Sequence, residues 1–215
     1  MNIQAQSSDP FATRSDLLVL MLSKRDKEVK ISPLTKKIDK VLGGLIASLI
    51  SNADINGDEG EMSLIYTPNL SEKNFYPKKI MILGLGDINL LSTDKVRKIS
   101  ASLIKKIKSL KVKKVHLLNE KSIFYKKVNL EKFFQSFTEG LILGNYKFNK
   151  YKEKDSSVTV EKFTFLDLDN ENKKIINRYI KVGSIYAKAE ILARDLVNEP
   201  GNMLSPSDLA QVAVK

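Results

Sequence analysis

The sequence predicts an α/β fold: a three-layer mixed sheet with helices on both faces, followed by a long helix. Short apolar runs alternate along the chain with segments of helical periodicity, which is the order typical of a layered α/β sheet. Several of these runs are apolar at nearly every residue, as expected for strands that helices cover on both sides. Helical spacing then continues without a break over residues 172–197.

The first predicted strand is DLLVLML, residues 16–22, a short apolar run bounded by polar residues. A helix is predicted next, because Ser32 can serve as N-cap and Pro33 suits the first helical position. Its apolar residues follow at helical spacing: Leu34, Ile38, Val41, Leu42, Leu45, Ile46 and Leu49. Segments 61–68 and 78–86 are predicted to be two further strands.

A second helix is predicted to start at Ser92, and it has clearly different faces. At about 100° per residue, the apolar residues share one side of this helix: Val96, Ile99, Leu103, Ile107 and Leu110. Lysines occupy the opposite side: Lys95, Lys98, Lys105, Lys106 and Lys108. Residues 113–119 are predicted to form a strand, residues 129–143 a helix, and residues 158–168 another strand.

The long helix admits two interpretations. About 26 residues span roughly 39 Å, more than a typical helix in a small domain. One face of this helix carries an apolar stripe: Ile175, Tyr179, Val182, Tyr186, Ala189, Ala193 and Leu196. Further apolar residues beside the stripe widen it: Ile176, Ile180, Ile185, Leu192 and Val197. The helix is either a core helix packed on the sheet or a rod that carries the chain into a next domain.

We favour the rod, because a new helix start follows it. Residues 205–208, Ser-Pro-Ser-Asp, have the form of a capping box with proline in the first turn. The predicted organisation is therefore an α/β domain over 1–170, a linker helix over 171–198, and the start of a truncated further domain over 199–215.

Composition limits the classes of function. The 215 residues carry a net charge of +11, but Arg supplies only five of the 36 basic residues. Since Arg is the better match to phosphates and guanine edges, nucleic-acid binding stays an alternative rather than the first choice. The absence of Cys excludes disulfides and thiolate metal sites. No apolar run approaches the roughly 20 residues of a membrane span, and residues 1–16 lack a secretory pattern. We therefore expect a cytoplasmic location and no membrane partner.

Two loops resemble ligand-binding patterns only in part. Gly84-Leu85-Gly86 follows a predicted strand, but Asn89 stands where a dinucleotide fingerprint needs its third glycine. A tight turn is the preferred interpretation, and a phosphate or nucleotide loop is the weaker one. A second loop resembles the opening of a calcium site, but Glu59 and Ile65 replace the required Gly and bidentate Glu. Its acidic and amide residues indicate a solvated turn: Asp54, Asn56, Asp58, Glu59 and Glu61.

The remaining candidates have simple structural explanations. His116 is the only histidine and lies between apolar residues of a predicted strand, so neither a zinc site nor a catalytic triad is supported. The lysine pairs 105–106, 113–114 and 126–127 are expected at the surface. Phe133, Phe134 and Phe137 have helical spacing and are expected in the core rather than as a base-stacking platform. We assign no catalytic, metal-binding or cofactor-binding residue.

One stretch near the end of the sequence carries a family resemblance. In ARDLVNEPGNMLSPSDLA, residues 193–210, the spacing of Arg194-Asp195-Leu196, Asn198, Pro200, Asn202 and Pro206 resembles the domain junction of leucyl aminopeptidases. A second stretch, residues 140–152, resembles the same family in Gly144, Tyr146, Phe148 and Tyr151. Two further stretches are similar to the same family: KIMILGLG resembles the family's central strand, and GDEGEMSLIY resembles the turn and strand that precede that strand.

The resemblance implies an N-terminal domain of the macro-domain type, a linking helix and a larger catalytic domain. In the family that larger domain holds two divalent metals, manganese, zinc or magnesium, which activate a water for attack on the first peptide bond. Its ligands and catalytic residues lie beyond the junction, so none maps onto residues 1–215. The resemblance also implies a homo-hexamer assembled through the catalytic domains, and a structural role for Arg194, Asp195, Asn198 and Asn202. We expect these 215 residues to be inactive alone.

Overall fold

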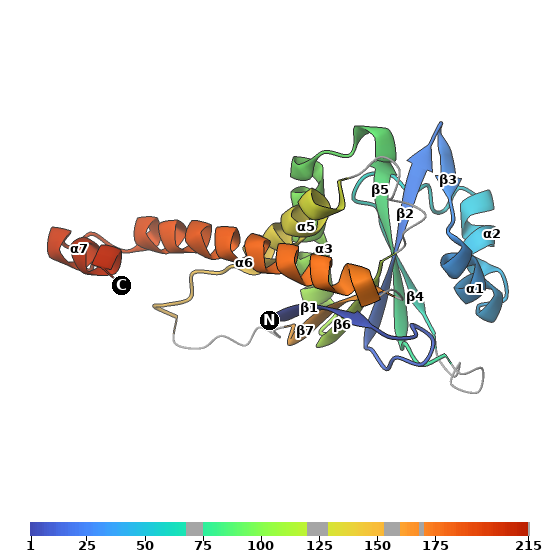
Figure 1. Ribbon diagram of the computed structural model, residues 1–215, viewed down its shortest axis with the longest axis horizontal. Helices are drawn as coiled ribbons and strands as arrows, with labels where there is room; N and C mark the ends of the chain where they lie inside the picture. The colour runs from blue at the N-terminus through green and yellow to red at the C-terminus, as the bar shows by residue number, and fades with distance from the viewer. Residues whose placement is uncertain (68–74, 120–128, 153–159, 168–169, 215) are drawn as a thin grey trace.

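The computed structural model describes residues 1–67, 75–119, 129–152, 160–167 and 170–214, which form a seven-stranded mixed sheet with helices around it (Figure 1). Neighbouring strands follow the order β1 (Asn2–Ser7), β7 (Lys162–Asp167), β6 (Lys114–Leu118), β2 (Leu17–Arg25), β5 (Lys79–Asp87) and β4 (Met62–Tyr66). The pairs from β1 to β5 are parallel. Both β4 and the short β3 (Glu28–Lys30), which pairs with β2, are antiparallel to their partners.

Helices cover both faces of this sheet. On one side lie α1 (Pro33–Val41) and α2 (Leu45–Ser51), and on the other lie α3 (Thr93–Ser109) and α5 (Leu130–Asn145) (Figure 1). Side chains of β2 alternate between the two cores: Val19 and Met21 join α3 and α5, whereas Leu18 and Leu20 join α1 and α2. The predicted three-layer α/β fold is confirmed.

Most predicted elements correspond to observed ones, but two strands were missed. The predicted strands at 16–22, 61–68, 78–86 and 113–119 correspond to β2, β4, β5 and β6, and the described part of 158–168 contains β7. Neither β1 nor β3 was predicted. In β1, Ala5 alone is fully buried, so this edge strand lacks the apolar run that signals a central one.

The single helix predicted after Ser32 is wrong, because the chain breaks it into α1 and α2. Gly43 and Gly44 adopt φ values of 73° and 82° between the two helices, a left-handed conformation that glycine reaches without steric cost. Ser32 caps α1 as predicted, by accepting a hydrogen bond from the Thr35 amide at 3.0 Å. The buried Asp39 carboxylate accepts from the Ile46 amide at 2.7 Å and so caps α2.

Two helices behind the sheet approach unusually closely. A Cβ atom on Gly140 of α5 would lie 2.3 Å from the backbone oxygen of Arg97 in α3. The Arg97 guanidinium binds the buried Glu139 carboxylate at 2.5 Å. This hydrogen bond raises the pKa of Arg97. The contact therefore combines backbone packing with a charged pair.

The long helix α6 runs from Asn170 to Asn198 and is 29 residues long. Ile176 and Ile180 of this helix pack into the core that α3 and α5 form on the sheet, and they are 2% and 5% exposed. Ala187 is also buried, at 1% exposed. The distal part extends past the sheet and past α5 (Figure 1). On another face, Ile185, Tyr186 and Leu192 are 59%, 60% and 50% exposed. The stripe predicted from the sequence is therefore divided: Tyr179, with the flanking Ile176 and Ile180, packs on the core, whereas its continuation from Tyr186 onward is largely exposed.

One residue of α6 also binds the outer edge of β1. The Asn177 side-chain oxygen accepts a hydrogen bond from the Ala5 amide at 2.9 Å, and its nitrogen donates to the Ala5 carbonyl at 3.4 Å. This side chain occupies both backbone groups that Ala5 directs away from the sheet. The start of α6 is thus tied to the sheet edge.

The last helix, α7 (Pro206–Val214), lies beyond the end of α6 (Figure 1). The predicted capping box is confirmed: the Ser205 hydroxyl accepts from the Asp208 amide at 3.2 Å, and the Ser205 amide donates to the Asp208 carboxylate at 2.9 Å. No residue of α7 is buried. Among the helices of the described ranges, none has the length and apolar content that crossing a membrane requires.

Candidate functional site at the end of the long helix

The two stretches that carry the family resemblance meet in the structure. After α5, residues 146–151, here named the strap, leave the body and run along the distal end of α6. There the helix presents Asp195 and, just past its last residue, Glu199. These two positions are one helical turn apart, so both carboxylates face the same side. About 50 residues of sequence separate the partners that this fold brings together.

Tyr146 forms the first half of this contact. Its hydroxyl donates to an Asp195 carboxylate oxygen at 2.6 Å and accepts from the side-chain nitrogen of Asn198 at 3.3 Å. The Arg194 guanidinium lies 5.9 Å from the centre of the Tyr146 ring, within the range of a cation–π contact. Three residues of the junction motif therefore hold one tyrosine of the strap.

Glu199 forms the second half of the contact. One carboxylate oxygen accepts from the Lys150 ammonium at 2.6 Å, and the other accepts from the Tyr151 hydroxyl. Only 10% of the Glu199 side chain is exposed. Phe148 packs beside Tyr151 with ring centres 5.9 Å apart. The strap thus binds the helix end through an ion pair and hydrogen bonds, while Phe148 and Tyr151 pack on one another within the strap.

The electrostatics keep this contact intact near neutral pH. The hydrogen bond to Asp195 raises the pKa of Tyr146, and the bond to Glu199 raises the pKa of Tyr151. The hydrogen bond from Lys150, followed by the one from Tyr151, lowers the pKa of Glu199. The tyrosines therefore stay neutral donors while Glu199 stays an anionic acceptor.

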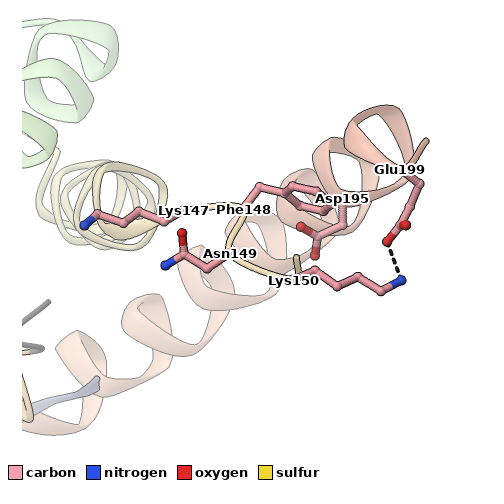
Figure 2. Close-up of a pocket in the computed structure, with 6 residues that line it drawn as sticks. All are labelled: Lys147, Phe148, Asn149, Lys150, Asp195 and Glu199. Carbon is pink, nitrogen blue, oxygen red and sulfur yellow. Dashed lines mark hydrogen bonds and ion pairs between the residues drawn. The ribbon is translucent and has the colours of Figure 1, made fainter. Parts of the chain in front are cut away.

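A cleft of about 370 Å³ lies between the strap and the helix end, lined by Lys147, Phe148, Asn149, Lys150, Asp195 and Glu199. Figure 2 shows Lys150 and Glu199 reaching toward one another, whereas Lys147 extends in another direction. Both carboxylates already bind partners from the strap. The arrangement holds two segments together.

The segment Gly84-Leu85-Gly86 is not a turn after a strand, as predicted, but the last part of β5 itself. Gly86 adopts a φ of 73°, and the pairing of β5 with β2 shifts register there. The Gly86 amide donates to the Gly57 carbonyl at 3.0 Å, and the Gly84 amide donates to the Glu61 carbonyl at 2.9 Å. A Cβ atom on Gly84 would lie 2.1 Å from the Asp58 carbonyl oxygen. These glycines let the preceding loop pack against the strand, and the amides that a phosphate would use are already engaged.

The acidic loop has its own internal order. The Glu61 carboxylate accepts from the Asn56 and Asp58 amides, each at 3.0 Å through one oxygen. Asp58 also binds Lys24 through its side chain. The carboxylate therefore closes a turn, in agreement with the interpretation made from the sequence.

His116 lies within the sheet on β6, beside Thr164 of β7. It is 6% exposed, and within the described part of the chain neither its Nδ1 atom nor the Thr164 hydroxyl has a hydrogen-bond partner. Burial, followed by the nearby Lys162, lowers the pKa of His116 to about 4. The imidazole is therefore neutral at physiological pH. Its buried place on β6 agrees with the prediction that His116 is a structural residue of the sheet.

The predicted surface and core clusters are placed as follows. Lys105 and Lys106 are exposed on α3, and Lys113 binds Glu161 at 2.8 Å. Lys126 and Lys127 lie outside the described residues. The phenylalanines Phe133, Phe134 and Phe137 of α5 are buried, as the core interpretation predicts. Phe134 and Phe137 pack against Phe163 and Phe165 of β7, and Phe133 packs against the other two phenylalanines of its helix.

Residues 19–155 match the family model described as the cytosol aminopeptidase family, N-terminal domain. This match covers well over half of the chain. The chain belongs to this family. The resemblance inferred from the two sequence stretches is thereby confirmed, although the junction stretch at 193–210 lies outside the matched range.

Curated relatives extend the match to nearly the whole chain. A probable cytosol aminopeptidase of Persephonella marina is 29% identical over 99% of this chain and 41% of its own length. A probable cytosol aminopeptidase of a Sulfurihydrogenibium species is 30% identical over 94% of this chain and 38% of its own. The chain thus spans about two fifths of the length of these relatives.

Solved structures share the fold. A mutant leucine aminopeptidase of tomato superposes with a TM-score of 0.75 at 22% identity, over 100% of this chain and 41% of that one. The bottromycin maturation enzyme BotP in complex with Mn gives 0.62 at 16% identity, over 92% of this chain and 35% of that one. At these identities the likeness concerns the fold alone.

Sequence inspection missed the pairing in this site. Lys150 and Glu199 lie inside the resembling stretches but were not singled out, although Tyr146, Tyr151 and Asp195 were. The available signal was the spacing of Asp195 and Glu199, two carboxylates on one side of a helix end. This spacing predicts a charged contact at the helix end, but it does not predict which residues form the other side of the contact.

Proposed function

We propose that residues 1–215 are the non-catalytic N-terminal part of a longer leucyl-type aminopeptidase, which releases N-terminal amino acids from peptides in the cytoplasm. Family membership and the greater length of the relatives support this. In this proposal residues 1–170 form the N-terminal domain, 171–198 link it onward, and 199–215 begin the catalytic domain. The chain alone is inactive, and peptide substrate binds elsewhere.

The contact between the strap and α6 carries the proposal. Residues of the two stretches that resemble leucyl aminopeptidases, among them Tyr146 and Asp195, bind one another at the point where the long helix ends. Residues used in this way fix the path of the polypeptide rather than contact a substrate. The domain therefore serves to position the polypeptide beyond α6.

The metals of the reaction are assigned to the remainder of the longer protein. The described residues contain no group of three or more His, Asp or Glu placed to hold an ion, and Asp195 and Glu199 are engaged by the strap. They do not fit a two-metal centre, whose ions are bridged by carboxylates. We assign two divalent ions, manganese, zinc or magnesium, to the catalytic domain, and with it the contacts of a homo-hexamer.

The test compares two lengths of the same gene product. Release of leucine from leucyl amide is measured with manganese present, for the 215-residue chain and for the longer product. We expect activity in the longer product and none in the 215-residue chain. Activity that grows with added metal in the shorter chain, after purification to constant specific activity, would overturn the proposal. Inactivity of both lengths against several aminoacyl amides would also count against it.

A further inference from the structure

The long helix carries an apolar face that the described residues leave largely uncovered. This face, here named the outer stripe, comprises Val182, Ile185, Tyr186, Ala189, Leu192, Ala193 and Leu196. Ile185, Tyr186 and Leu192 are at least half exposed, Ala189 and Ala193 are exposed, and Val182 and Leu196 are half-buried. Contiguous apolar surface of this kind marks an interaction site.

The spacing of the outer stripe specifies the shape of its partner. Val182, Ala189 and Leu196 recur every seven residues, and Ile185 and Leu192 fall three residues after the first two. This is the pattern with which one helix packs against another in a coiled coil. Over about 21 Å, at 1.5 Å per residue, it offers two heptads to a second helix.

The charges beside the stripe make a second copy a poorer partner than an acidic helix. Lys181 and Lys188 are exposed and lie immediately before Val182 and Ala189, at the heptad position that flanks the seam. In an antiparallel pair of identical helices centred on the stripe, Lys188 would face its own copy, and Lys181 would face Asp195, which Tyr146 of the strap already binds. In a parallel pair these lysines would face Tyr186 and Ala193, which carry no negative charge. A helix with acidic residues beside its own apolar stripe fits both features.

The length of the relatives indicates where such a helix comes from. The outer stripe lies beyond residues 19–155, the range of the family's N-terminal domain, on the helix that leads away from the sheet. The relatives contain more than twice the length matched here. We propose that the outer stripe docks an amphipathic, acid-flanked helix contributed by the part of the longer protein outside residues 1–215. The inference rests on the proposed function only in assuming that longer product.

Hydrogen exchange in the two lengths of the protein tests this directly. We expect the amides of residues 182–196 to exchange more slowly in the longer product, by on the order of tenfold or more. Ile185→Asp with Leu192→Asp should abolish that extra protection but leave the melting temperature of the 215-residue chain unchanged. Lys181→Glu with Lys188→Glu should reduce the protection, whereas Lys174→Glu, about two turns earlier on the helix, should not.

Each outcome separates this inference from the aminopeptidase proposal. An active longer product with equal exchange at 182–196 in both lengths would overturn the docking and leave the function standing. An inactive longer product with protection that the aspartates abolish would support the docking and count against the function. Sedimentation of the 215-residue chain covers self-association, since a dimer that Ile185→Asp dissociates would make a second copy the occupant and overturn the inference.

Discussion

The sheet body and the distal half of α6 are held in place by different forces. In the body, β2 sends fully buried leucines and valines into cores on both faces, so burial of apolar surface stabilises it from two directions. Beyond Ala187, the helix is held mainly by the hydrogen bonds and the ion pair of the strap. The difference shows that the body buries its apolar side chains on both faces of the sheet, whereas the outer part of α6 leaves large apolar side chains exposed.

The largest effect should come from filling the close contact inside the body. Gly140→Val places side-chain atoms where the Arg97 carbonyl already lies, and we expect a loss of about 3 kcal/mol in the free energy of unfolding. Gly201→Val is the matched control, because nothing lies within 4 Å of a Cβ atom there. Urea unfolding should show the control within about 0.5 kcal/mol of the parent. Similar losses in both variants would contradict the packing argument.

A smaller effect should appear in the acid stability of the body. The pKa of His116 is about 4 in the folded chain, below its ordinary value of 6.5. Between these values the unfolded chain binds more protons, so stability is full above pH 6.5 and falls as the pH drops toward 4. We expect this histidine to contribute a loss on the order of 2 kcal/mol over that window.

The measurement is urea unfolding at several pH values between 4 and 7, with His116→Leu beside the parent. Other groups titrate in both proteins, so the difference between the two curves isolates the imidazole. The variant should lose less stability on acidification. Two parallel curves would show that His116 does not titrate on unfolding.

The regions also differ in how far the sequence alone could describe them. Central strands such as β2 and β5 were predicted because burial on two faces requires an uninterrupted apolar run. The edge strand β1 was not, since Ala5 is its one fully buried residue. The break between α1 and α2 was present in Gly43-Gly44, but apolar spacing continued across it.

The candidate site was predictable only in its parts. Tyr146, Tyr151 and Asp195 belonged to recognisable stretches, yet their pairing depends on where α5 ends and how α6 crosses the body. The stripe of α6 was visible, but periodicity cannot tell a face that packs on its own sheet from one that packs on a partner. Both Ile180 and Ile185 are apolar, and only the fold separates them.

Removing the hydrogen bonds of the strap should loosen the distal end of α6 and leave the stability of the sheet body unchanged. Tyr146→Phe with Tyr151→Phe removes the hydroxyls that bind Asp195 and Glu199. We expect hydrogen exchange in residues 190–198 to become several-fold faster, with the amides of β2 and β5 unchanged, because local opening does not require global unfolding. Tyr66→Phe is the control, since Tyr66 is exposed on β4. Unchanged exchange at 190–198 would show that the hydroxyls do not hold the helix.

The smallest effect should follow from removing the cap of α7. Ser205→Ala deletes the hydroxyl that accepts from the Asp208 amide, which costs a helix about 1 kcal/mol locally. Because no residue of α7 is buried, the melting temperature of the whole chain should not change. NMR chemical shifts of residues 206–214 should move toward random-coil values. A shift in the global melting temperature would show that α7 is coupled to the body.

The bond between Asn177 and Ala5 has a consequence for assembly. An open sheet edge can recruit strands from other molecules and so lead to fibres. Here the amide of Asn177 occupies both backbone groups at Ala5, so an incoming strand would have to displace it before pairing there. The side chain of Asn177 therefore guards the middle of β1 against pairing with a strand of another molecule.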